Sequence, residues 1–83
     1  MPSSILRLPS VKARTGLSRS TLYLRISERL FTKPISLGGR SVGWPSQEVA
    51  AIISARIAGK TDEEVRTLVA GLENARRMAS GEQ

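Results

Sequence analysis

The spacing of hydrophobic residues changes twice along this chain of 83 residues, and this change limits the possible folds most. Before Lys33-Pro34, hydrophobic residues recur at helical spacing. From Ile35 to Trp44 they alternate with small or polar residues, and after Pro45 the helical spacing returns. The pattern predicts a mainly α-helical domain that contains one small β-hairpin.

The first helical stretch predicts two short helices. The stretch from Leu8 to Gly16 forms the first, with Pro9 or Ser10 at its start, and Gly16 is placed to end it in a left-handed conformation. Ser18 is a good N-cap for a second helix from about Arg19 to Arg29, whose buried face carries Leu22 and Ile26. Two short helices joined by a glycine-containing turn form a helix-turn-helix.

The alternating stretch predicts a two-stranded hairpin. Gly38-Gly39 makes its turn, and Arg40 and Ser41 lie near its tip. An isolated hairpin is only marginally stable, so it must lean on the helices. We expect Phe31 and Trp44 to pack the hairpin against the helices, both as core side chains.

Two further helices follow the hairpin. The third begins at Pro45-Ser46-Gln47-Glu48 and ends at Gly59. Its hydrophobic stripe consists of Val49, Ile52, Ile53 and Ile57. The fourth begins with a capping box, Thr61 as N-cap and Glu64 three residues later. Its stripe consists of Val65, Leu68, Val69 and Leu72.

The fourth helix has two possible packing partners. Leu68, Val69 and Leu72 can pack on the third helix, or they can dock a second subunit or another protein. The expected organisation is a flexible leader at 1–6, a winged helix-turn-helix at 7–59, a C-terminal amphipathic helix at 60–78 and a disordered tail at 79–83.

Charge is unevenly distributed along the chain, whose net charge is +6. Residues 1–44 carry eight Lys or Arg and one acid, Glu28, whereas residues 45–83 carry five basic and six acidic residues. A basic half beside a near-neutral half is typical of one surface for a polyanion and another for packing or partners. A generic solubilising charge is the alternative.

Composition excludes several kinds of site. The chain has no cysteine and no histidine, so it lacks disulfides, thiol nucleophiles, imidazole bases and the usual zinc ligands. We expect no enzymatic activity, no metal and no cofactor. No hydrophobic run reaches the length of a membrane span, and there is no signal-peptide pattern, so we expect a cytoplasmic protein associated with the nucleoid.

The helix, turn, wing and tryptophan occur together and in order, and residues 7–57 thereby resemble the AlpA family of prophage regulators. This family is a branch of the MerR-like winged helix-turn-helix proteins and is related to small phage excisionases. The stretches that carry the resemblance are Gly16-Leu17-Ser18-Arg19-Ser20-Thr21-Leu22-Tyr23 and Phe31-Thr32-Lys33-Pro34-Ile35-Ser36-Leu37-Gly38-Gly39-Arg40-Ser41-Val42-Gly43-Trp44. Three positions depart from the family pattern: Leu24 replaces Arg, Arg29 replaces a common Gly, and Thr32 replaces Pro.

A DNA-binding surface follows from these elements. The polar start of the second helix can meet a phosphate, and its side chains can reach base edges in the major groove. The cationic hairpin can reach the adjacent minor groove. The candidate DNA-binding residues are Ser18, Arg19, Ser20, Thr21, Tyr23, Arg25, Lys33, Arg40 and Ser41.

Several functions fit this sequence. The first is a transcriptional regulator of a prophage or mobile element that binds double-stranded DNA, as a homodimer or a cooperative array. The second is an excisionase, or recombination directionality factor, that bends attachment-site DNA and contacts an integrase or another phage protein. A protein-interaction adaptor or anti-repressor is the third, and RNA binding is a weaker option because exposed stacking aromatics are missing.

Overall fold

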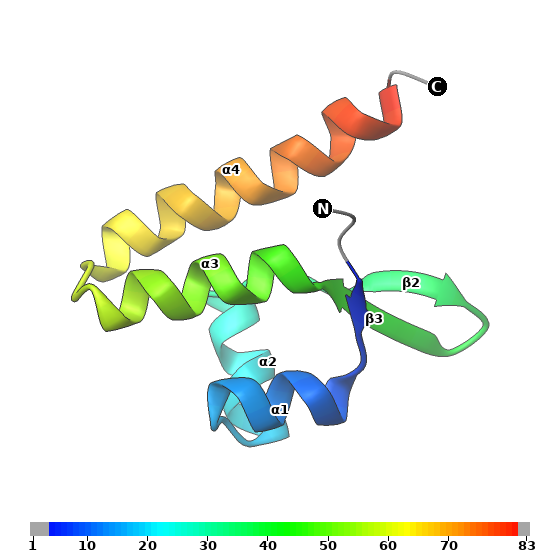
Figure 1. The fold of residues 1–83 in the computed structure, drawn as a ribbon, viewed down its shortest axis with the longest axis horizontal. Coiled ribbons are helices and arrows are strands. Elements are labelled where there is room, and N and C mark those ends of the chain that lie inside the picture. The colour runs from blue at the N-terminus through cyan, green and yellow to red at the C-terminus, as the bar shows by residue number, and fades with distance from the viewer. Residues whose placement is uncertain (1–3, 82–83) are drawn as a thin grey trace.

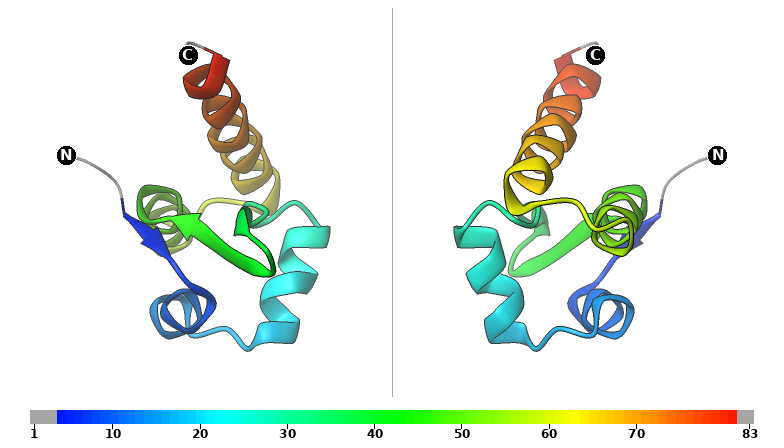
Figure 2. Two further views of the ribbon diagram at one scale, coloured as in Figure 1. Left: turned by 90° about the vertical axis from the view of Figure 1, so that its right-hand side faces the viewer. Right: turned by 90° about the vertical axis from the view of Figure 1, so that its left-hand side faces the viewer.

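The computed structural model describes residues 4–81, and in this range four helices lie to one side of a small antiparallel sheet (Figure 1). In chain order the elements are β1 (Ile5–Leu6), α1 (Leu8–Thr15), α2 (Arg19–Ser27), β2 (Ile35–Gly38), β3 (Ser41–Pro45), α3 (Ser46–Ile57) and α4 (Asp62–Gly81). Helix α3 lies between α4 and α1 (Figures 1 and 2). The predicted fold class, a winged helix-turn-helix with an additional C-terminal helix, is confirmed.

Helices α1 and α2 form the predicted helix-turn-helix. Helix α1 ends at Gly16, whose φ of 74° is left-handed and whose N–H donates to the carbonyl of Lys12 at 2.8 Å. A residue without a Cβ adopts this conformation at little cost, which explains the glycine. Ser18 caps α2, because its hydroxyl accepts a hydrogen bond from the Thr21 N–H at 3.2 Å.

The end of α2 differs from the prediction. The helix ends at Ser27 and not at Arg29, which adopts a left-handed φ of 64°. The Arg29 N–H donates to the carbonyl of Ile26, and the Leu30 N–H donates to the carbonyl of Arg25 at 2.8 Å. This pair of bonds is a Schellman motif, with arginine at the position that favours glycine.

The predicted flexible leader is wrong where the structure describes it. Ile5 and Leu6 form β1, which pairs with β3 opposite Pro45 and Trp44, so the strand order is β1-β3-β2. Leu6 is buried, and the burial of its side chain explains why this segment joins the sheet. Residues 1–3 lie outside the described residues.

Close packing of β1 on β3 requires a glycine in β3. A Cβ at Gly43 would collide with Cγ2 of Ile5 and would lie 3.1 Å from the backbone carbonyl oxygen of Leu6. The two-stranded hairpin of the prediction is therefore the outer part of a three-stranded sheet, with Gly43 at the junction.

Trp44 is the centre of the core, as predicted. It is completely buried, and its ring meets those of Phe31 and Tyr23 edge to face, at centroid distances of 6.4 and 6.5 Å. Its Nε1–H donates to the carbonyl of Thr32 at 2.8 Å. These contacts join the sheet to α2 and to the segment that follows α2.

The start of α4 confirms the predicted capping box. The Glu64 N–H donates to the hydroxyl of Thr61 at 3.1 Å, and the Thr61 N–H donates to the Glu64 carboxylate at 2.9 Å. This backbone hydrogen bond holds the pKa of Glu64 below its ordinary value. Deprotonated Glu64 therefore favours the start of α4.

Helix α4 packs on its own domain. Val65 and Val69 are buried in the common core, and Leu68 and Leu72 pack against it. The third-helix stripe is partly wrong, because Ile57 is 81% exposed. Helices α3 and α4 are in contact and diverge away from the turn that joins them (Figure 1), and the apolar face of α4 packs on the core of its own chain.

The predicted tail at 79–83 is also wrong in part, because α4 continues to Gly81. Residues 82 and 83 lie outside the described residues. Within residues 4–81, no helix combines the length and the hydrophobicity needed to cross a membrane.

Candidate nucleic-acid interface

The first turn of α2 presents a group of hydroxyls. Ser18 donates to the hydroxyl of Thr21 at 3.0 Å, and the Ser18 and Ser20 hydroxyl oxygens lie 3.4 Å apart. Ser18 and Ser20 are exposed and Thr21 is half-buried. The positive end of the helix dipole and these small polar side chains suit an approaching phosphate.

Arg19 and Tyr23 form one unit beside this turn. The Arg19 guanidinium carbon lies 5.4 Å from the centroid of the Tyr23 ring, which is cation–π geometry. Tyr23 is half-buried because its ring also contacts Trp44. With Ser20 the two residues line a shallow hollow, so the packed tyrosine orients an exposed arginine.

The outer face of α2 carries Leu24, which is 56% exposed. Ser27, one turn farther along, is also exposed, and its hydroxyl donates to the Leu24 carbonyl at 2.7 Å. Arg25 is half-buried and lines a groove with Arg14. The helix thus separates Arg19 and Arg25 on different flanks, with Leu24 and Ser27 on the face between them.

The hairpin of β2 and β3 is a protruding cationic wing (Figure 1). Gly38 and Gly39 both have positive φ, 104° and 55°, which allows the chain to reverse tightly. Arg40 is exposed beyond them, and Ser41 is half-buried as the first residue of β3. Arg40 is therefore the cation that the wing presents, and Ser41 pairs with Gly38 beside the turn.

Arg7 is a candidate that the sequence did not single out. It is exposed, and its Nε donates to the carbonyl of Val42 at 3.1 Å. The bond places a second guanidinium beside the wing. The pairing of β1 with β3 brings residue 7 to this position, and a leader at 1–6 that was expected to be flexible gave no reason to expect that pairing.

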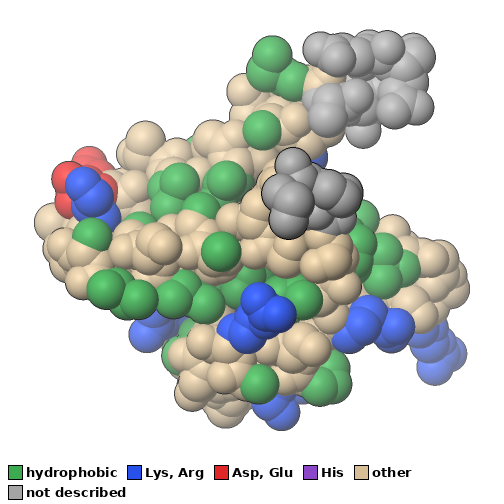
Figure 3. Space-filling model, in the orientation of Figure 1, with side chains coloured by type: hydrophobic (Ala, Val, Ile, Leu, Met, Phe, Trp, Pro, Cys, Tyr) green, Lys and Arg blue, Asp and Glu red, His purple; other side chains and the backbone are tan. Residues whose placement is uncertain are grey.

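Basic side chains gather on the side of the molecule formed by α1 and the hairpin (Figure 3). Acidic side chains appear on the same view at the opposite upper corner, where α3 turns into α4. The unequal charge of the two halves of the sequence therefore becomes an unequal charge of two sides of the fold.

Helix α4 holds the segment that connects α2 to the wing. Arg66 Nε donates to the carbonyl of Glu28 at 2.9 Å. The Lys33 N–H donates to the Glu73 carboxylate at 2.9 Å, and the Lys33 carbonyl accepts from Arg76 at 2.8 Å. Lys33 is predicted to bind DNA, and its side chain is exposed. Its backbone N–H and its backbone carbonyl are both held by side chains of α4.

Arg76 also joins α4 to α3. Its Nε donates to the Glu48 carboxylate at 2.8 Å, and its Nη2 bonds the second carboxylate oxygen. Glu48 is 3% exposed, so this two-pronged bond satisfies a buried charge. We call Arg66, Glu73, Arg76 and Glu48 the α4 clamp. From the sequence alone, Glu48 is expected only to favour a helix start, and its partner Arg76 is not indicated.

No group of three acidic side chains that could hold a metal ion occurs within the described part of the chain. The remaining candidates, Leu68, Val69 and Leu72, belong to the core contacts of α4 and lie away from this surface.

Comparison with known proteins agrees with the geometry. Residues 4–57 match the family described as prophage CP4-57 regulatory protein (AlpA). The chain is 47% identical over 55 residues to "Uncharacterized protein ORF88" of Enterobacteria phage P4, which covers 66% of this chain and 62% of that protein. It is 38% identical over 58 residues to the "DNA-binding transcriptional activator AlpA" of Escherichia coli strain K12, which covers 63% of this chain and 83% of that protein. No solved structure gives a significant match.

The matched residues contain β1, the helix-turn-helix, the wing and α3, whereas α4 lies beyond them. The match covers well over half of the 83 residues, and so the chain belongs to the AlpA family of prophage regulatory proteins.

Proposed function

We propose that this chain is a sequence-specific DNA-binding regulator of a prophage or another mobile element. Helix α2 enters the major groove, and the wing contacts the adjacent minor groove. The observation that carries the proposal is the placement of a polar helix start and a cationic hairpin on one rigid unit, joined by the contact of Tyr23 with Trp44. Family membership and the printed activity of the Escherichia coli relative support it.

The proposed contacts divide into two kinds. Arg19 and Ser20 read base edges, because they lie at the exposed start of α2 beside the Tyr23 ring. The second kind contacts phosphates or the minor groove and consists of Ser18, Thr21, Lys33 and Arg40. Such contacts position the protein on DNA but depend little on the base sequence. Arg25 binds backbone phosphate at most, because it is half-buried on the other flank of α2. Leu24 is placed to contact a thymine methyl group.

A salt series tests the central claim. Anisotropy of a labelled random duplex measures the affinity at several salt concentrations, and log affinity should fall linearly with log salt by about 0.9 per phosphate neutralised. Absence of binding at low salt would overturn the proposal and turn attention to a protein partner for the basic side.

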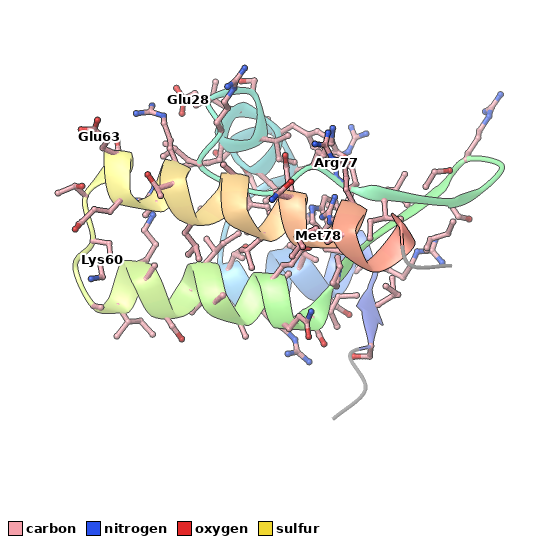
Figure 4. All side chains as sticks on the ribbon, turned by 90° about the horizontal axis from the view of Figure 1, so that it is seen from above. Glu28, Lys60, Glu63, Arg77 and Met78 are labelled. Carbon is pink, nitrogen blue, oxygen red and sulfur yellow. The ribbon has the colours of Figure 1, made fainter. Side chains whose placement is uncertain are left out.

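The wing is tested by Arg40→Ala. We expect weaker binding to every duplex, a salt slope reduced by about 1, and little change in sequence preference, because Arg40 is proposed to contact backbone or minor groove. Lys60→Ala is the matched control, since Lys60 is exposed at the turn between α3 and α4 (Figure 4). Equal affinities for Arg40→Ala and the wild type would remove the wing from the interface.

A further inference from the structure

A groove lies on the flank of α2 that carries Arg25, between the C-terminal parts of α1, α2 and α3. Its volume is about 380 Å³. Hydrophobic side chains, including Leu17, Ile53 and Ile57, line it, and three arginines, Arg14, Arg25 and Arg56, add positive charge. We call this the α1–α3 groove. It is separate from the hollow formed by Arg19, Ser20 and Tyr23.

The α1–α3 groove is both uncovered and electrostatically unbalanced. Ile57 is 81% exposed, the largest exposed fraction among the large hydrophobic side chains of the described residues. Arg56 is paired with Asp62 at 3.0 Å, but Arg14 and Arg25 form no ion pair within residues 4–81. An occupant that suits this groove has a hydrophobic residue next to a carboxylate.

The chain itself carries such a surface. At the turn between α3 and α4, the exposed side chain of Ile57 lies near an acidic helix start. Glu64 is used in the capping box and Asp62 is paired with Arg56, whereas the exposed Glu63 side chain forms no hydrogen bond or ion pair within the described residues. Figure 4 shows Glu63 on the first turn of α4, at the same end of the molecule as Lys60.

The acidic turn and the α1–α3 groove share one end of the molecule. Ile57 belongs to both, because it lines the groove and ends the helix that leads into the turn. Figure 3 shows a row of hydrophobic side chains along α3 between the acidic corner and a basic side chain below it. A surface with adjacent complementary halves can pair with itself about a two-fold axis.

We infer that a second copy of this chain occupies the α1–α3 groove, and that two copies form a two-fold dimer in the absence of DNA. In this dimer the Glu63 carboxylate of each copy faces Arg14 and Arg25 of the other, and the two Ile57 side chains are buried together. An interface with two-fold symmetry joins only two subunits. The contacts of Glu63 with Arg14 and with Arg25 therefore each occur twice in the dimer. The inference stands whether or not the protein binds DNA.

The test measures the oligomeric state of the full chain without DNA by sedimentation velocity over a concentration series. The wild type should dimerise, and its dissociation constant should rise with salt. Ile57→Asp should raise this constant at least tenfold while leaving the monomer folded, because the side chain is exposed. A wild type that stays monomeric at low salt overturns the inference, as does an Ile57→Asp protein that dimerises normally.

Charge reversal gives the sharper test. Arg14→Glu and Glu63→Lys should each dimerise poorly alone, because residue 14 of one copy and residue 63 of the other then carry like charges. A mixture of the two proteins should recover dimers, since residues 14 and 63 then carry opposite charges at both of their contacts across the interface. Arg77→Glu is the control, because it reverses the charge of one exposed residue toward the C-terminal end of α4, away from the acidic turn (Figure 4). It should leave the dissociation constant of the dimer unchanged. A mixture that stays monomeric would show that these charges do not meet.

The two proposals fail separately. A wild type that binds DNA but stays monomeric without it refutes the second copy in the groove and leaves the regulator. A wild type that dimerises but does not bind DNA refutes the regulator and leaves the second copy in the groove.

Discussion

Arg29 carries a local strain that the family pattern avoids. Its φ of 64° belongs to the left-handed region, which costs a residue with a Cβ about 1 kcal/mol relative to glycine. Arg29→Gly should therefore raise the free energy of unfolding by about 1 kcal/mol. Urea unfolding followed by the fluorescence of the buried Trp44 measures this difference.

The control for this prediction is Arg29→Ala. It removes the same charge but keeps a Cβ, so we expect no comparable gain in stability. An equal gain in both variants would assign the effect to the loss of positive charge and would contradict the role of backbone strain.

Arg19 is the residue to which we assign the main part of base reading. We expect Arg19→Ala to reduce the free energy of specific binding by about 1–3 kcal/mol and to relax the preference at one base pair. Competition titrations with operator variants and random duplex measure both quantities. Tyr23→Leu should produce part of the same loss, because it removes the ring 5.4 Å from the guanidinium carbon. Equal losses on operator and random DNA would make Arg19 a phosphate contact.

Among the elements, α4 is the one whose role the sequence predicted least well. Its hydrophobic stripe predicted a helix, but the spacing of Leu68, Val69 and Leu72 could not indicate which surface the stripe covers. The polar contacts of α4 were beyond prediction for a similar reason. Arg76 and Glu48 are 28 residues apart, and each is ordinary for a helix surface until the fold brings them together.

The α4 clamp predicts a large and specific loss of stability. Arg76→Met leaves the Glu48 carboxylate buried without its partner, which costs about 3–5 kcal/mol. The double variant Glu48→Met/Arg76→Met removes both charges and should recover most of this loss. Urea unfolding of the wild type, both single variants and the double variant gives the coupling energy. Additive losses in the double variant would contradict a buried ion pair.

The sequence predicted the structure correctly wherever a local sequence pattern is compatible with only one local structure. Gly16, Ser18 and Thr61 gave the helix boundaries, because left-handed glycines and N-caps act through bonds within a few residues. It failed at Ile5 and Leu6, whose two-residue strand has no periodicity of its own and depends on the distant Gly43. Arg7 was missed as a wing residue for the same reason.

At the scale of the whole molecule, a winged helix-turn-helix of this size reads a short stretch of DNA. Two recognition helices on one duplex lengthen the site, and the relation between them fixes the symmetry of the operator. A two-fold dimer through the α1–α3 groove requires two half-sites in inverted orientation. A cooperative array of monomers produces direct repeats, the arrangement that would accompany an excisionase role.

Selection of bound duplexes from a random library distinguishes these assemblies. We expect the wild type to select an inverted repeat, with half-site centres separated by one helical turn of about 34 Å or by a multiple of it. Ile57→Asp should select a single half-site, because Ile57 lies outside the proposed DNA surface and contributes only to the dimer. Energy transfer between dyes on the ends of the selected duplex then reports bending. Direct repeats with strong bending would contradict the two-fold dimer and assign the protein to recombination, since bent DNA brings distant attachment sites to an integrase.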